Sequence, residues 1–211
     1  IILLARTEAA GENRHAGLTQ FLVDMSLAGV RPNPITDLTG GRDFNEVALE
    51  DVFVADDYVL GKPGDGWKLV TGELAYERSG PERFLSTLPV LSELVRRAGA
   101  APQEASLQET VGRLVAHLAT LRRMSVALAG MLDRGESPQV EAALVKDLGN
   151  AYEREIPEIV RLVADRIPDR TSADALASLL GQSILAAPSF TLRGGTREIL
   201  RGIIARELGL R

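Results

Sequence analysis

The feature that most constrains the fold of this chain is a change of hydrophobic period near residue 67. Before it, β-branched and aromatic residues gather in short runs separated by polar turns, a pattern typical of strands. After it, apolar residues recur three and four positions apart, which predicts amphipathic helices. A block of strands followed by a block of helices, without alternation, favours separate β and α domains over a doubly wound sheet.

The two blocks divide the chain at residues 1–64 and 65–211, so we predict an α+β, multidomain fold. Some 60 residues with four strands would leave open sheet edges, and we therefore expect further strands, ahead of residue 1, to complete the β part. Long amphipathic helices joined by short loops predict a helical bundle for the rest. The predicted strands cover residues 1–7, 18–24, 30–35 and 44–54, and the predicted helices cover 67–97, a segment around 107–121, 138–165, 172–186 and 196–207.

Composition excludes several classes of function. The net charge of −5 and the scattered Lys and Arg residues argue against nucleic acid as a partner. The chain has no cysteine, and its two histidines, His15 and His117, lie far apart with no obvious ligand partner, so we predict no metal site. No apolar run reaches the roughly 18–20 residues of a membrane span and no leader pattern is visible, so we expect a soluble, cytoplasmic protein.

The stretch GELAYERSGPERF, residues 72–84, interrupts a helical pattern with Gly80-Pro81 and places a Glu-Arg pair on each side. Pro81 has no amide hydrogen, so the carbonyl of Glu77 loses its partner four residues on, and a kink is expected there. Taken alone, the pairs are typical of solvated surface charges and the Gly-Pro step of a helix start or bend.

Three stretches together resemble the acyl-CoA dehydrogenase family. FLVDMSLAGVRPNPI, then FNEVALEDVFVADDYVLGKPGDGW and ELAYER, resemble the end of that family's middle, barrel-like β domain and the entry to its C-terminal all-α domain. RGGTREILRGIIARELGLR resembles its closing motif, in which a Gly-Thr pair opens the last helix. The likeness preserves order and spacing over nearly the whole chain. It implies that residues 1–64 end the middle domain and that residues 65–211 form the helical bundle.

The resemblance also implies an oxidoreductase of lipid metabolism and β-oxidation that carries FAD and forms a tetramer. Such an enzyme converts an acyl-CoA thioester to its 2,3-enoyl form: a carboxylate removes the α-proton while the β-hydrogen leaves as hydride to the flavin. An electron-transfer flavoprotein is the expected acceptor. A general base of this kind must be held against the α-carbon, and hydrogen bonds to the thioester oxygen must stabilise the enolate-like charge.

The base in many family members immediately precedes the Gly-Thr pair, and here that position is Gly194, which has no side chain. A second branch, which includes the isovaleryl and long-chain dehydrogenases, carries its base on the first long helix, just before an arginine. In this chain that position is Glu77, followed by Arg78, which we expect to position the acid. Glu73, one turn earlier, is the nearest competitor, whereas Glu82 and Glu46 match no base position and are interpreted as surface charges.

The resemblance assigns part of the cofactor site to the start of the last helix. Gly195 and Thr196 open this helix, where free amides and the positive end of the dipole suit polar or anionic groups. In the family, the Thr and the residue two positions beyond it, here Glu198, lie near the adenosine part of FAD. An ordinary Gly-Thr helix cap is the alternative interpretation.

The chain also departs from the family pattern. The Arg-x-Phe-Gly motif, whose arginine reaches the FAD of a neighbouring subunit, is replaced by RRAGAAPQEASLQ, and GQSILAAPSF lacks the family's glutamine and paired glycines. Such losses resemble bacterial dehydrogenases built as heterotetramers of two unlike subunits, several of which act on bulky sterol side-chain thioesters. The alternatives are a homotetramer, a non-catalytic structural subunit, or a relative that uses flavin as an acyl-CoA, nitroalkane or hydroxylamine oxidase. The acyl chain is not indicated.

Overall fold

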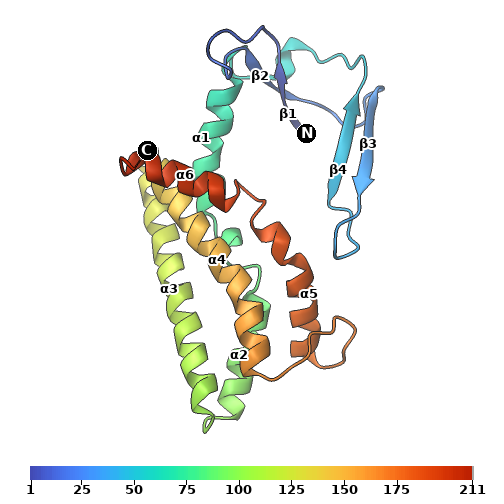
Figure 1. Cartoon of the computed structure of the whole chain (residues 1–211). Coiled ribbons are helices and arrows are strands. Elements are labelled where there is room, and N and C mark those ends of the chain that lie inside the picture. Colours follow the sequence, from blue (N-terminus) through green and yellow to red (C-terminus); the bar gives the residue numbers. More distant parts are fainter. Residues whose placement is uncertain (211) are drawn as a thin grey trace. The chain divides into compact units, whose positions relative to one another are not determined.

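The computed structural model describes residues 1–210, which form two compact units, Ile1–Glu73 and Leu74–Arg211. The first unit holds all five strands of the described residues and the second holds most of the helical sequence (Figure 1). This α+β fold confirms the predicted class. The boundary between the units falls within α1 (Gly66–Ser79), and the predicted domain boundary at residue 64 stays a prediction.

The strand unit contains two small antiparallel sheets. One has the order β1-β2-β5 and the other pairs β3 with β4. The β1 and β2 strands align residue by residue, from Ile2 opposite Leu22 to Arg6 opposite Leu18. His15 stacks on Trp67, with 4.0 Å between ring centroids, so this histidine packs within the unit. The strands are β1 (Ile2–Arg6), β2 (Leu18–Leu22), β3 (Val30–Ile35), β4 (Phe44–Leu49) and β5 (Val59–Leu60), with a 3-10 turn, η1 (Asp56–Tyr58), before β5.

The break predicted at Gly80-Pro81 within residues 67–97 is present, but it is a complete end of the helix and not a kink. The helix ends at Ser79, and a 3-10 turn, η2 (Pro81–Arg83), separates it from α2 (Leu88–Ala100). The physical cause is the one expected for Pro81, but its effect is larger than a bend, because Gly80 takes an extended conformation with φ −64° and ψ 153°. A side chain from a distant helix supports the free end: the Ser125 hydroxyl donates to the carbonyl of Ser79 at 2.6 Å.

Four further helices complete the second unit. They match the predicted segments, although α3 extends further than expected and α5 continues through Pro188. In Figure 1, α2, α3, α4 and α5 run alongside one another and α6 crosses α4, and the helix contacts agree with this arrangement. The helices are α3 (Ala105–Asp133), α4 (Gln139–Val163), α5 (Ala175–Phe190) and α6 (Arg197–Glu207).

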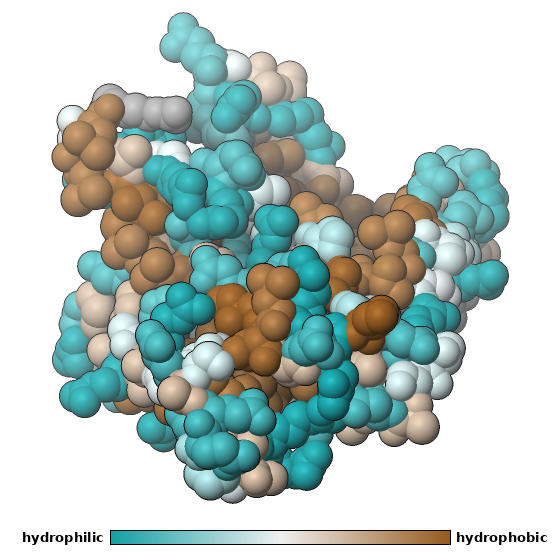
Figure 2. Space-filling model, turned by 60° about the horizontal axis from the view of Figure 1, so that its bottom comes forward, coloured by the Kyte–Doolittle hydropathy of each residue, from teal (hydrophilic) through white to brown (hydrophobic). Residues whose placement is uncertain are grey.

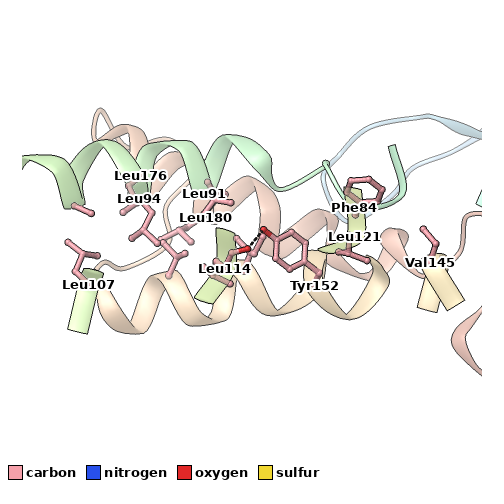
Figure 3. Packing of buried hydrophobic residues seen from close by; sticks show 14 of the residues in the cluster. Phe84, Leu91, Leu94, Leu107, Leu114, Leu121, Val145, Tyr152, Leu176 and Leu180 are labelled. Carbon is pink, nitrogen blue, oxygen red and sulfur yellow. Dashed lines mark hydrogen bonds between the residues drawn. The ribbon is translucent and has the colours of Figure 1, made fainter. Parts of the chain in front are cut away.

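The core of this unit lies along one side of α3. Leu107, Leu114 and Leu121 recur every seven residues, and all three are buried (Figure 3). They pack against α2, α4 and α5, and the Tyr152 hydroxyl donates to the Leu114 carbonyl at 2.9 Å. That bond pairs a phenol that would otherwise be unsatisfied in an apolar environment. Within residues 1–210, no helix is both long enough and apolar enough to cross a membrane.

Candidate active site

The break after α1 is held together by one arginine. Pro81 leaves the carbonyl of Glu77 without its helical partner, and the Arg83 Nε–H donates to that carbonyl at 2.8 Å. The same guanidinium donates through Nη2 to Oε1 of the Glu77 carboxylate, also at 2.8 Å. Arg83 is buried, and the Glu77 side chain is 36% exposed. One side chain therefore satisfies the backbone of Glu77 and fixes its carboxylate.

The closing loop between α5 and α6, which contains Gly194, also contacts the end of α1. The Nε–H of Arg78, a residue that is 5% exposed, donates to the carbonyl of Gly194 at 2.8 Å. Burial lowers the pKa of Arg78, while the adjacent Glu77 carboxylate acts in the opposite direction. The bond ties the end of α1 to a loop more than a hundred residues further along the chain.

Gly194 lies directly beside the carboxylate of Glu77. A Cβ built on Gly194 would be 3.4 Å from Glu77 Oε1 and 3.5 Å from its Cδ. Gly194 has a φ of +70°, and Gly195, which follows it, has a φ of +108°, so both occupy conformations that glycine adopts readily. The two positions that the sequence resemblance names for a catalytic base thus meet at one point in the fold.

A row of polar residues on α4 is buried beneath this turn. Lys146, Asn150 and Glu153 follow one another at helical spacing and have no exposed surface. Glu153 accepts from the amide of Ser86 at 2.9 Å and from Nη2 of Arg193 at 2.8 Å. The carboxylate therefore connects α4 with the segment after η2 and with the closing loop.

Lys146 is the most unusual member of the row. Its ammonium donates to the Phe190 carbonyl at 2.9 Å and to the side-chain oxygen of Asn150. Burial, followed by repulsion from Arg193 and Arg83, lowers the pKa of Lys146 to about 8, although Glu153 and Glu77 act in the opposite direction. These interactions mean that the charges of α4, η2 and the closing loop form one cluster.

The start of α6 contains two of the residues that the family resemblance assigns to the cofactor, Thr196 and Glu198. Thr196 is the N-cap residue, with an extended backbone, and its side chain makes no capping hydrogen bond to the helix. Hydrogen bonds from the backbone amide of Glu198 and from the Thr196 side chain lower the pKa of Glu198. The alternative of an ordinary threonine cap therefore lacks its defining bond.

The structure places Glu77, Arg78, Gly195, Thr196 and Glu198 in the helical unit, and it brings Glu77 and Arg78 together with the closing loop. Their assigned roles stay predictions. Glu73, the competitor, is exposed, as are Glu82 and Glu46. Within residues 1–210, no group of three or more His, Cys, Asp or Glu side chains is arranged to hold a metal ion.

The sequence pattern did not indicate four residues of this cluster: Arg83, Lys146, Glu153 and Arg193. Arg83 could have been found, because it follows the proline that frees a carbonyl and belongs to the second Glu-Arg pair of the break. The α4 residues carried no such signal, since polar residues at helical spacing usually form a solvated face. Leu144 and Leu148, on the same helix, are exposed at 37% and 46%.

Known proteins resemble the chain along almost its whole length. The chain is 36% identical over 218 residues to acyl-CoA dehydrogenase IpdE1 of Mycobacterium tuberculosis, a match that covers 99% of this chain and 54% of the relative. It is 29% identical to acyl-CoA dehydrogenase FadE34 of the same organism, over 98% of this chain and 28% of the relative. Among solved structures, the Tcur3481-Tcur3483 steroid ACAD superposes with a TM-score of 0.81 at 21% identity, over 99% of this chain and 55% of the other. No protein-family model matches. The chain therefore spans about half of IpdE1 and about a quarter of FadE34.

Proposed function

Since the chain belongs to the acyl-CoA dehydrogenase family and corresponds to the C-terminal half of its members, we propose that it supplies the catalytic base of an FAD-dependent acyl-CoA dehydrogenase. The reaction is the α,β-dehydrogenation of an acyl-CoA thioester, with Glu77 as the base. One observation carries the proposal: the Cβ position of Gly194 is 3.4 Å from Glu77 Oε1. The carboxylate thus lies where a side chain on the closing motif would begin.

The residues around Glu77 suit proton abstraction. Arg83 and Arg78 are buried and positively charged, and Arg83 donates a hydrogen bond to the carboxylate of Glu77 at 2.8 Å. The α-proton moves to the carboxylate of Glu77, and the electron pair of that C–H bond stays on the substrate as enolate-like charge. Arg78 also fixes the closing loop through the Gly194 carbonyl, and this bond keeps the opposite wall of the site in place.

FAD, when bound, would accept the β-hydrogen as hydride. The start of α6 fits the adenosine side of this cofactor. The first amides of α6 receive no bond from the Thr196 side chain, and Gly195, with a φ of +108°, has a conformation that glycine adopts readily. The carboxylate of Glu198 can accept from sugar hydroxyl groups. Gly195, Thr196 and Glu198 would therefore hold this part of the cofactor.

Glu77→Gln tests the proposal. The substitution keeps the size of the side chain and an acceptor for Arg83, so folding and flavin content should be unchanged. Anaerobic bleaching of the flavin by an acyl-CoA substrate should slow by about 10²–10⁴, the usual contribution of a general base. The assay needs the full-length protein, together with its partner subunit if assembly requires one. Bleaching at the rate of the unmodified protein would remove Glu77 from the mechanism.

We further propose that the chain works as a subunit of an oligomer, with an electron-transfer flavoprotein as acceptor. The face formed by α3 and α4 supports this assembly. It exposes the apolar side chains of Leu144 and Leu148 on α4, and it contains a cavity of about 270 Å³ between the two helices. Apolar residues also form patches among hydrophilic ones on the face shown in Figure 2. Exposed apolar surface of this kind marks sites of protein association.

A non-catalytic structural subunit is the second candidate. It is favoured by the sequence RRAGAAPQEASLQ, which replaces the family motif that reaches a neighbour's flavin, and by a structural neighbour described with two named chains, Tcur3481-Tcur3483. Flavin stoichiometry separates the two candidates. One FAD per pair of unlike chains, with bleaching insensitive to Glu77→Gln, would support the structural subunit.

A further inference from the structure

We infer that Arg83 is a positioning residue that fixes the Glu77 carboxylate, with Oε1 held by the guanidinium and Oε2 as the oxygen that receives the substrate's α-proton. This inference rests on the proposed function of Glu77. Arg83 makes two separate bonds to the same residue, one to its backbone and one to its carboxylate, each 2.8 Å long. One rigid guanidinium holds both the backbone carbonyl and the side-chain Oε1 of this glutamate. The side chain therefore loses most of its rotational freedom.

Arg83 is itself held from two directions. Its backbone packs against α4 so closely that a Cβ on Gly149 would be 2.5 Å from the Arg83 carbonyl oxygen. Its guanidinium also lies 3.8 Å from the carboxylate of Glu82. Only 8% of Arg83 is exposed, so the side chain cannot move freely into solvent. The position of the base is thus set by α4 through η2.

Arg83 acts on the base through geometry. Its two bonds restrict the carboxylate, and misplacement of a reacting group by about 1 Å can slow a reaction about 100-fold. Arg78 remains in contact with the closing loop and keeps a positive charge at the end of α1 when Arg83 is removed, so loss of position is the main change that we expect.

The test compares Arg83→Met and Arg83→Lys in the full-length holoenzyme by single-turnover flavin bleaching. Arg83→Met should slow bleaching at saturating substrate by about 10- to 100-fold and change the substrate dissociation constant by less than about 3-fold. Arg83→Lys should recover little, since an ammonium cannot hold the carbonyl and the carboxylate together.

A chemical rescue uses a third variant, Arg83→Ala. Added guanidinium should accelerate flavin bleaching by this variant in a concentration-dependent manner. Arg96→Met is the matched control, because Arg96 is exposed and pairs with Glu93 on its own helix.

A second measurement does not depend on the flavin. The thermal midpoints of Arg83→Met, Glu77→Gln and the double variant should be non-additive, because the two side chains form one ion pair. In the Glu77→Gln background, Arg83→Met should cause no further loss of bleaching. If Glu77→Gln abolishes bleaching while Arg83→Met reacts at the unmodified rate, the inference about Arg83 fails and the proposed function stands. If Glu77→Gln bleaches normally, the proposed function itself fails. Additive thermal midpoints would also overturn the inference.

Discussion

Gly194 and Glu77, separated by 116 residues in the chain, are close enough that a Cβ on the glycine would contact the carboxylate oxygen at 3.4 Å. The two positions that the sequence resemblance names for the base are therefore neighbours in space. A carboxylate can reach the same region from the end of α1 or from the closing loop. This proximity allows a direct test of whether a carboxylate at position 194 can replace the carboxylate of Glu77.

We predict that Gly194→Glu partly rescues Glu77→Gln. The new side chain would begin 3.4 Å from the position of Glu77 Oε1, so its carboxylate can reach the same region, and bleaching by acyl-CoA should recover by about 10-fold relative to Glu77→Gln alone. Recovery should be incomplete, because a non-glycine residue at φ +70° costs about 1–2 kcal/mol. Gly194→Gln in the same background is the control, since it has the same strain without a base. Equal rates for the two double variants would contradict the prediction.

Gly149→Ala should disturb the candidate site through the contact between α4 and Arg83. The added methyl group would lie 2.5 Å from the carbonyl oxygen of Arg83, so α4 and η2 must separate. We expect a loss of about 1–3 kcal/mol in the free energy of unfolding, as in other overpacked contacts, with slower flavin bleaching as Arg83 shifts. Gly112→Ala on α3 meets open space and should be neutral or stabilising. A stable, fully active Gly149→Ala variant would show that the turn tolerates the displacement.

The buried ammonium of Lys146 makes stability depend on pH in the alkaline range. Its pKa falls from 10.5 to about 8 on folding, so between these values the unfolded chain binds more protons and the free energy of unfolding rises with pH. The full effect is about 3 kcal/mol, with 1.36 kcal/mol per pKa unit. Thermal midpoints of the unmodified protein and of Lys146→Met should therefore converge or cross as pH rises from 7 to 10. A constant difference over this range would mean that Lys146 does not titrate there.

Replacing Glu153 by Gln should lower the free energy of unfolding less than replacing it by Ala. Glu153→Ala leaves the Ser86 amide without its acceptor and the Arg193 guanidinium without its counterion, and should cost about 2–4 kcal/mol in denaturant unfolding. The lower end is expected because the Arg193 side chain retains 30% exposure. Glu153→Gln keeps an oxygen for the Ser86 amide and should lose less. Equal losses would show that charge, and not the hydrogen bond to Ser86, dominates.

Leu148→Glu should weaken assembly without unfolding the subunit. Leu148 is 46% exposed on α4 and lines the cavity between α3 and α4, so a charge there meets water in the isolated chain but an apolar surface in an oligomer. Light scattering should show a lower mass for this variant. Val95→Glu, on α2 and 42% exposed, is the control that should keep the original mass. An unchanged mass for Leu148→Glu would place the interface elsewhere.

Much of the secondary structure could be predicted because it depends on local properties. The strand at Val30–Ile35 matches its predicted limits, and the recurrence of apolar residues three and four positions apart predicted the helices that follow residue 67. The effect of Pro81 on the Glu77 carbonyl also followed from covalent structure. Its consequence was underestimated, since a kink and a complete end of the helix begin with the same lost hydrogen bond.

The partners of the charged residues could not be predicted in this way. Lys146 and Glu153 have the helical spacing of a solvated face, and only the packing of α4 against η2 and the closing loop buries them. By itself, the sequence determined the order of strands and helices and the break at Pro81, because period and missing amides act over a few residues. Only the tertiary structure decided that Arg83, Arg78 and Gly194 surround Glu77, because hydrogen bonds between distant segments depend on how the helices pack.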